Sequence, residues 1–208
     1  MLIASSLTCP VHGGKLRSVK DDAARKVPGV RDVIRLENAV AVTATNFWSC
    51  QQALKALEIE WDLGHHASID SAQLDKGLLF LSHSPLEPMT CVAHVRADMC
   101  ELWVGCQAPG FAQMGAAKVC GLPVDKVVIH NQLIGGGFGR RLESDFIYQA
   151  VDIARQLSYP IKLIWSREED MTHDRYRPHY VDRLNAALGK DLKPVGWEHR
   201  IAGASVMA

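Results

Sequence analysis

The sequence lacks the short motifs that mark the commonest metal, redox and nucleotide-binding sites. Its six cysteines include no C-x-x-C pair and no C-x4-C-x2-C series, which argues against a zinc ribbon, a thioredoxin-like centre or a plant-type iron–sulfur cluster. The nine histidines include no H-E-x-x-H pair, and we interpret His65-His66 as a solvated loop pair rather than a metal site. We therefore expect no metal ligand in this chain, and we expect most cysteines to be buried as small apolar residues in a reducing compartment.

The chain also lacks an excess of either charge and a long apolar run. Lysine plus arginine and aspartate plus glutamate each number 23, so no nucleic-acid or membrane-surface partner is expected. No apolar run approaches the roughly 20 residues that span a bilayer. The first residues, from Met1 to Ala4, include no basic region, so we expect no signal peptide and a cytoplasmic location, or a periplasmic one if an upstream signal is missing. A hydrophobic content of 48% in 208 residues suffices for one large or two small domains.

The most distinctive stretch that is present runs from Leu133 to Leu142 and reads LIGGGFGRRL. A strand is predicted before it at 126–130 and a helix after it at 143–157. Bare N–H groups of such a loop can bind an oxyanion, and two arginines add positive charge. It is neither a dinucleotide fingerprint nor a P-loop, because Arg140 and Leu142 occupy the last position of the two G-x-G-x-x-G registers and the chain has no G-K-[ST] tripeptide. A tight turn with a solvated arginine pair is the alternative interpretation.

Hydrophobic periodicity predicts an α+β chain in two parts. The first part, up to about residue 62, is predicted to have the order β-β-α-β-β-α-β, with strands at 1–7, 15–19, 30–36, 39–43 and 58–62, a short helix at 21–26, and a second helix capped by Asn46. Residues 64–76 are polar and irregular, which is typical of a linker. The second part is predicted to contain a hairpin (90–97 and 101–105), a helix (110–120), a strand (126–130), a helix (143–157), a strand (161–165), an acidic turn or helix (166–172) and a second hairpin (179–187 and 194–201). The helix at 110–120 is expected to bury Phe111, Met114, Ala117 and Val119.

Four motifs, in this order and spacing, resemble the xanthine dehydrogenase/aldehyde oxidase family of molybdenum hydroxylases, with the isoquinoline 1-oxidoreductase beta (large) subunits as the nearest branch. The motifs are LEPM at 86–89, WVGCQAPG at 103–110, GGGFGRR at 135–141, and IWSREED at 164–170 with YRP at 176–178. The resemblance covers most of this chain but only the first part of such a subunit. It implies an α/β hammerhead-like domain at 1–63, a linker at 64–85 that is shorter than in relatives, and the first part of a molybdopterin-binding domain at 86–208.

The resemblance also implies a cofactor and its ligands. The cofactor would be molybdopterin with molybdenum, in the cytosine dinucleotide form, and [2Fe–2S] clusters would lie on a small partner subunit. Gln107 would lie beside the molybdenum, the glycine main chain would touch the pterin, Phe138 would also line the substrate cavity, and the arginine fork would suit the pyrophosphate. The cofactor-binding residues expected from the resemblance are Gln107, Gly135, Gly136, Gly137, Phe138, Gly139, Arg140 and Arg141.

Plainer interpretations stand beside these roles. Gln107 could be a strand-end residue facing solvent, Phe138 a buried core aromatic, and Arg141 a surface charge paired with Glu143 or Asp145. We expect the neighbouring motifs to be structural: the turn that contains Glu87 and Met89 would support the cofactor from behind, and Arg167 would pair internally.

The function implied is that of part of the molybdenum-binding subunit of an oxidoreductase that hydroxylates N-heteroaromatics or aldehydes with oxygen from water. The family's general base is a glutamate near the end of the subunit, beyond residue 208, so no catalytic residue is assigned here and the isolated chain is expected to be inactive. The partners would be the remainder of the large subunit, the small [2Fe–2S] subunit and a small aromatic or aldehyde substrate. The alternatives are a cofactor-free structural or interaction fragment and a generic anion-binding module.

Overall fold

The computed structural model describes residues 1–64, 67 and 81–203, and the predicted linker therefore lies largely outside the described residues. Within this part of the chain, one seven-stranded mixed sheet has the order β3-β4-β1-β9-β6-β7-β8, and β2-β5 and β10-β11 form two separate pairs. The strands are β1 (Leu2–Thr8), β2 (Lys15–Lys20), β3 (Val30–Arg35), β4 (Ala39–Ala44), β5 (Glu58–Asp62), β6 (Thr90–Val95), β7 (Cys100–Val104), β8 (Val127–Asn131), β9 (Ile161–Ile164), β10 (Tyr180–Leu188) and β11 (Pro194–Gly203). The helices are α1 (Asp22–Arg25), α2 (Phe47–Lys55), α4 (Pro109–Cys120), α5 (Asp145–Ala154) and α6 (Arg167–Thr172), with 3₁₀ turns η2 (Val124–Lys126) and η3 (Arg140–Leu142).

The first part of the chain has the predicted order β-β-α-β-β-α-β. Strand β4 is buried along its whole length, and its alternating side chains reach two different clusters: Ala41 belongs to the main core, whereas Val42 packs with Ala53 of α2. This is the expected result for a central strand whose faces are both covered. The predicted cap of α2 is confirmed, because the Asn46 side chain accepts a hydrogen bond of 2.9 Å from the N–H of Ser49.

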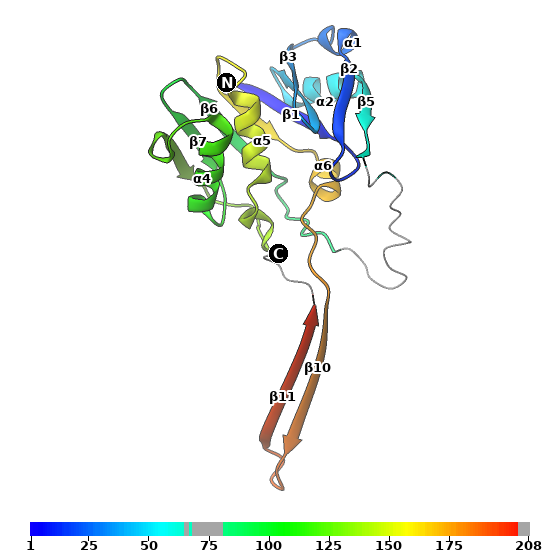
Figure 1. Cartoon of the computed structure of the whole chain (residues 1–208), viewed down its shortest axis with the longest axis vertical. Coiled ribbons are helices and arrows are strands. Elements are labelled where there is room, and N and C mark those ends of the chain that lie inside the picture. The colour runs from blue at the N-terminus through cyan, green and yellow to red at the C-terminus, as the bar shows by residue number, and fades with distance from the viewer. Residues whose placement is uncertain (65–66, 68–80, 204–208) are drawn as a thin grey trace.

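The large sheet continues across the predicted boundary between the two parts. Strand β1 pairs in parallel with β9, so that Leu2 lies opposite Ile161 and Ala4 opposite Leu163. The same core cluster contains Ala4 of β1 and Phe146 of α5. Figure 1 shows the first strand running into the region of the later helices. The predicted division at 63 and 86 is therefore not a division between separate sheets, and it stays a prediction about domains.

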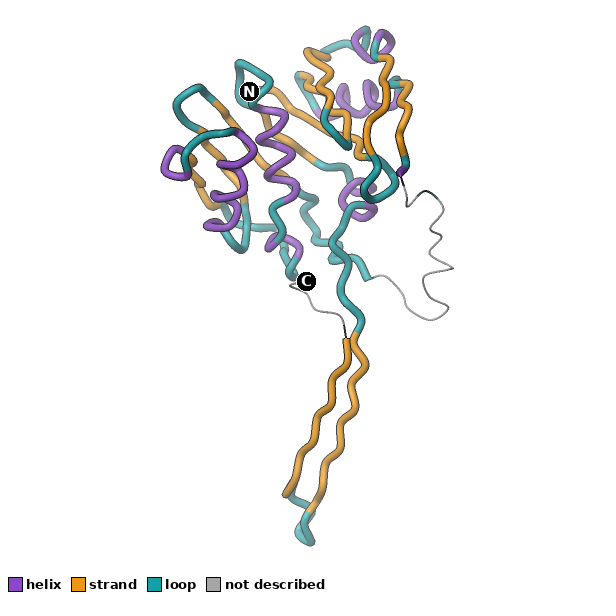
Figure 2. The backbone as a smooth tube through the Cα atoms, viewed as in Figure 1, coloured by secondary structure: helices purple, strands orange, loops and turns teal. Residues whose placement is uncertain are grey.

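Helices α4 and α5 cover one face of the β6–β8 end of the sheet (Figure 2). The helix predicted at 143–157 is confirmed as α5, and its apolar residues form a buried stripe that includes Phe146, Ile147, Ala150, Val151 and Ala154. Strands β6 and β7 form the predicted antiparallel hairpin, and β7 and β8 pair in parallel. This parallel pair places the chain segments after β7 and after β8 at one edge of the sheet.

The predicted buried face of α4 is wrong in part. Ala117 is buried as expected, but Phe111 is 68% exposed and Met114 is 47% exposed. The helix instead buries Ala112 and Ala116, because its small residues let α5 come close. At Gly115 an added Cβ would lie 2.1 Å from the Tyr148 hydroxyl, which shows how tightly the two helices pack. Since α4 is apolar on most sides, periodicity alone could not select the inner face.

The second hairpin, β10-β11, extends away from the rest of the molecule (Figure 1), and its residues are exposed along both strands. The register places Ala186 opposite Trp197 and Asp182 opposite Ile201. Side chains therefore alternate between a face that carries Leu184, Trp197 and Ile201 and a more polar face. An isolated two-stranded hairpin is marginally stable in water, so an uncovered apolar face here marks a surface for association.

Candidate functional site

The glycine loop, residues 135–139, lies beyond the shared edge of β7 and β8. It follows β8 and leads through η3 into α5, while Gln107 follows β7. The two segments are joined by hydrogen bonds from the N–H of Gln132 to the carbonyl of Val104 (3.0 Å) and from the N–H of Gln107 to the carbonyl of Arg141 (2.9 Å). The structure thus brings together the two motifs that the sequence analysis assigned to one site.

Four consecutive carbonyl groups of this loop are held by donors from the surrounding scaffold. The donors are the N–H of Glu87 to Gly135 (3.1 Å), Nε of Arg141 to Gly136 (2.9 Å), the N–H of Arg140 to Gly137 (2.8 Å) and Nη2 of Arg177 to Phe138 (2.7 Å). We call these four contacts the carbonyl clamp. Two of the donors, from Arg140 and Arg141, are local to the loop, and two, from Glu87 and Arg177, come from elsewhere in the fold.

The carbonyl clamp determines where the N–H groups of the loop point. The described chain has no cis peptide bond, so each N–H points away from the carbonyl of the residue before it. The N–H groups of residues 136–139 are accordingly directed away from the clamp, and none of them donates to another group in the described residues. Successive backbone N–H groups in a turn conformation can form an anion-binding nest, and we call residues 136–139 the nest on this basis.

Positive φ angles give the loop its shape: +97° at Gly136, +54° at Phe138 and +104° at Gly139. A non-glycine residue in this region is strained, and such strain is commonly found at binding sites. The Phe138 side chain is 65% exposed, so the alternative that it is a buried core aromatic is wrong. Its role as a cavity wall stays a prediction.

Gln107 lies directly over the middle of the loop. A Cβ added at Gly137 would lie 2.7 Å from Oε1 of Gln107, so a side chain at this position must displace the amide. Gln107 is exposed, as both the cofactor role and the solvent-facing alternative predict. Its Nε2 has no partner within the described residues, which leaves a neutral donor free beside the nest.

Arg141 is not a surface charge. Only 1% of its side chain is exposed, and its donors contact the carbonyl of Gly136, the carbonyl of Gly105 (3.2 Å), and both the carbonyl (3.1 Å) and Oε2 (2.8 Å) of Glu87. Burial lowers the pKa of Arg141, although Glu87 opposes this, and a guanidinium remains charged. The alternative interpretation, a surface pair with Glu143 or Asp145, is wrong for this residue, because the fold buries it and places Glu87 beside it.

Arg140 is also withdrawn from the surface. Its side chain is fully buried and forms a bidentate pair with Asp145, both contacts being 2.9 Å. Its Nε lies 3.0 Å from Asp174 as an ion pair without hydrogen-bond alignment, and its guanidinium lies over the Trp165 ring at 5.6 Å. In this arrangement neither arginine presents its fork to solvent, and both hold the loop or its surroundings. The expectation that they meet a pyrophosphate stays a prediction.

The structural predictions for the neighbouring motifs are confirmed. Oε2 of Glu87 accepts a hydrogen bond of 2.9 Å from the N–H of Gly135, and Met89 is fully buried. Arg167 donates to Asp170 and to the carbonyl of Leu86, both at 2.8 Å. These contacts join the LEPM segment, the loop and α6 into one support.

Two residues beneath the loop were missed by the sequence analysis. Asp174, whose side chain is 1% exposed, accepts hydrogen bonds from the N–H of His83 and from Ser82 Oγ (2.9 Å), and lies 3.1 Å from Nδ1 of His83. Burial alone would raise the pKa of Asp174, but these hydrogen bonds and the nearby His83 outweigh it and lower the pKa. No sequence signal could have paired residues that are 91 positions apart.

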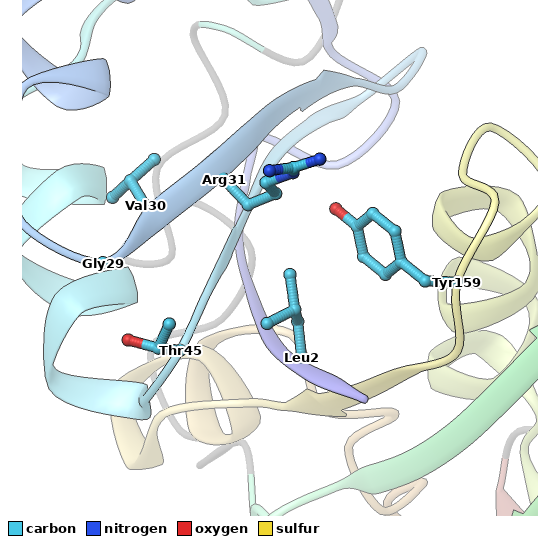
Figure 3. Close-up of a pocket in the computed structure, with 6 residues that line it drawn as sticks. All are labelled: Leu2, Gly29, Val30, Arg31, Thr45 and Tyr159. Atoms are coloured by element: carbon cyan, nitrogen blue, oxygen red, sulfur yellow. The ribbon is translucent and has the colours of Figure 1, made fainter.

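Two hollows of the structure lie away from the glycine loop. One, of about 450 Å³, has Arg31 and Tyr159 among its lining residues, and their side chains point toward each other (Figure 3). Burial and a hydrogen bond to Asp32 raise the pKa of Tyr159 to about 12, which suits a structural hydroxyl. A second, of about 1100 Å³, lies between the turn after β1, the polar side of α5 and the segment after α6. Neither is lined by residues 135–139, of which Gly137 is buried, Gly136 and Gly139 are partly exposed, and Gly135 and Phe138 are exposed.

Comparisons with known proteins identify a domain family and several relatives. The model described as the molybdopterin cofactor-binding domain matches residues 80–205. The chain is 32% identical over 255 residues to isoquinoline 1-oxidoreductase subunit beta of Brevundimonas diminuta, in a match that covers 100% of this chain and 32% of the relative. It is 27% identical over 236 residues to the membrane-bound aldehyde dehydrogenase [pyrroloquinoline-quinone] of Gluconacetobacter polyoxogenes, with coverage of 92% and 30%.

A comparison with solved structures finds a similar fold. The solved structure of quinoline 2-oxidoreductase from Pseudomonas putida 86 superposes with a TM-score of 0.68 at 18% identity, over 97% of this chain and 35% of that chain. This likeness extends to the fold alone. The chain thus spans about a third of the length of the relatives that it matches. Among the described residues, no helix combines the length and apolarity needed to cross a membrane.

Proposed function

Because this chain belongs to the molybdopterin cofactor-binding domain family, we propose that it forms part of the molybdenum-binding subunit of an oxidoreductase. The parent enzyme hydroxylates N-heteroaromatic compounds or aldehydes with oxygen derived from water. The names of the two relatives, an isoquinoline oxidoreductase and an aldehyde dehydrogenase, support these substrate classes. The other partners in this proposal are the remainder of the large subunit and a small subunit that carries [2Fe–2S] clusters.

The single observation that carries the proposal is the nest of unpaired N–H groups at residues 136–139, held open by the carbonyl clamp. A pterin cofactor offers oxygen acceptors and a phosphate, and backbone N–H groups are suitable donors to both. The loop residues from Gly135 to Gly139 and the free amide of Gln107 would hold the cofactor, which we take to be the cytosine dinucleotide form. Arg140 and Arg141 contribute by fixing the loop. When bound, the molybdenum centre would supply the redox chemistry.

Residues of this chain also determine how close the cofactor can come. The absence of a side chain at Gly137 keeps Gln107 over the loop, and the exposed ring of Phe138 stands beside the same surface.

We assign the first part of the chain, residues 1–63, to an α/β hammerhead-like domain, which its β-β-α-β-β-α-β order supports.

The test is the cofactor content of the subunit that contains this chain, purified from a host that makes the molybdenum cofactor. Gly137→Val is expected to lose most of the molybdenum and pterin, because the new side chain occupies the position of Gln107 and blocks backbone approach. Gly196→Val is the matched control, since a Cβ there would make only an ordinary contact of 3.5 Å with Ala187. A normal molybdenum content in Gly137→Val would reject the assignment.

The same measurement separates the alternatives. A subunit that copurifies with neither molybdenum nor pterin would favour a cofactor-free structural or interaction fragment. If a quinone rather than a pterin is extracted from the subunit, the chain would instead bind pyrroloquinoline quinone, the cofactor named for the Gluconacetobacter relative. Stabilisation by phosphate alone, without any molybdenum, would favour a generic anion-binding module.

A further inference from the structure

Arg177 is the arginine that faces solvent beside the nest. Arg177 lies in the segment after α6 and is exposed. Its main-chain N–H donates to the carbonyl of Leu81 at 3.1 Å, and its Nη2 donates to the carbonyl of Phe138 at 2.7 Å. Within the described residues its guanidinium has no other partner and forms no ion pair. The remaining N–H donors of the side chain are therefore available.

Arg177 differs in this respect from the two arginines of the loop motif. Arg140 and Arg141 are buried and their charges are paired with carboxylates. Arg177 contacts the loop itself, and within the described residues no carboxylate neutralises its charge. A guanidinium is also the side chain best suited to a phosphate, because its planar donors match the geometry of the oxygens.

The contact with Phe138 has a second effect on the site. By holding the carbonyl of Phe138, Arg177 directs the N–H of Gly139 to the opposite side of that peptide plane. It is the one member of the carbonyl clamp that is both an exposed side chain and remote in sequence from the loop. Its loss would release the last peptide of the nest without removing a buried ion pair.

We propose that Arg177, rather than Arg140 or Arg141, is the cationic side chain of the anion site. It positions the Phe138–Gly139 peptide and supplies the positive charge for a phosphate group of the ligand. This inference rests on the proposed function of the loop and adds the residue that recognises the charge of the cofactor.

The test uses this chain, inorganic pyrophosphate as the probe, and titration calorimetry at low ionic strength. Arg177→Ala is expected to weaken binding about tenfold, which corresponds to about 1.4 kcal/mol. Arg175→Ala is the matched control, because Arg175 is exposed two residues away, its variant loses the same charge, and its side chain has no partner within the described residues. We expect a change of less than about twofold for this control, and an intermediate loss for Arg177→Lys, which keeps the charge without the fork.

The outcomes are distinguishable. Equal losses in Arg177→Ala and Arg175→Ala would overturn the inference, since general charge would then explain the effect. If Gly137→Val abolishes pyrophosphate binding while Arg177→Ala binds pyrophosphate as tightly as the unaltered chain, the anion-binding role of the loop is supported and the assignment of Arg177 is wrong. If the unaltered chain binds no pyrophosphate, the anion role of the loop fails as well. The positioning role is tested separately by NMR. The chemical shift of the Gly139 amide must change more in Arg177→Ala than in Arg175→Ala.

Discussion

Replacing Arg141 with methionine should destabilise the whole protein, because this side chain connects three segments that meet at the site. Methionine keeps much of the length and apolar volume of arginine but removes every donor. The lost contacts reach the carbonyl groups of Gly105, Gly136 and Glu87 and the Glu87 carboxylate, at distances between 2.8 and 3.2 Å. The variant therefore tests whether Arg141 is a structural residue or a ligand-binding one.

The size of the effect follows from the burial of each partner. Removing one member of a buried ion pair costs about 3–5 kcal/mol, because it leaves an uncompensated charge. The Glu87 side chain is 42% exposed, so water can solvate its carboxylate and this value is an upper bound. Each buried acceptor left without a donor costs about 1–3 kcal/mol, and Gly105 is buried whereas Gly136 is partly exposed. We expect a loss of about 2–4 kcal/mol in the free energy of unfolding.

The assay is thermal and urea unfolding of the chain. For a protein of this size, such a loss corresponds to a fall in Tm of about 4–16 °C. Arg155→Met is the control, because the pair that Arg155 forms with Asp152 is half exposed on the surface of α5 and should contribute less than about 1 kcal/mol. An Arg141→Met variant that unfolds like Arg155→Met would refute the structural role and restore Arg141 as a candidate ligand for the pyrophosphate. A double-mutant cycle with Glu87→Gln should give a coupling energy of about 0.5–3 kcal/mol.

Two further predictions concern packing and association. Gly115→Ala should lower the free energy of unfolding by about 1–3 kcal/mol, because its Cβ would overlap the Tyr148 ring between α4 and α5. Gly110→Ala is the control and should not destabilise the chain, because an added Cβ there meets nothing within 4 Å. Equal stability of the two variants would contradict the packing of α4 against α5. The chain should self-associate through the apolar face of β10-β11, so Trp197→Ser should lower the mass measured by light scattering, whereas Val181→Ser on the opposite face should not. A chain that stays monomeric at all concentrations would rule out that association.

Local patterns predicted much of the fold. The element order of the first part, the Asn46 cap, both hairpins and the buried stripe of α5 followed from periodicity and capping residues. The family that the four motifs resembled is confirmed by the domain match over residues 80–205. These features succeed because a helix or hairpin is specified by residues close in sequence.

Features that depend on the partner of an element could not be predicted in this way. The parallel pairing of β1 with β9 joins strands about 160 residues apart, and a strand pattern does not identify its neighbour. The inner face of α4 was misjudged for a related reason. Ala112 and Ala116 are buried while Phe111 is exposed, because close approach to α5 favours the smaller residues. In both cases tertiary contact, rather than local hydrophobicity, determines the outcome.

The arginine pair shows where a stricter physical argument would have improved the prediction. A glycine-rich loop has few side chains of its own, yet each of its buried carbonyl groups needs a donor. If its N–H groups are to face a ligand, the carbonyls must face the protein, and donors must come from neighbouring residues. Arg140 and Arg141 follow the loop directly and supply two of the four donors, one from a main-chain N–H and one from a side chain. A basic pair next to such a loop is therefore as well suited to hold the loop as to bind its ligand, and the ligand's charge is left to a residue from elsewhere in the fold.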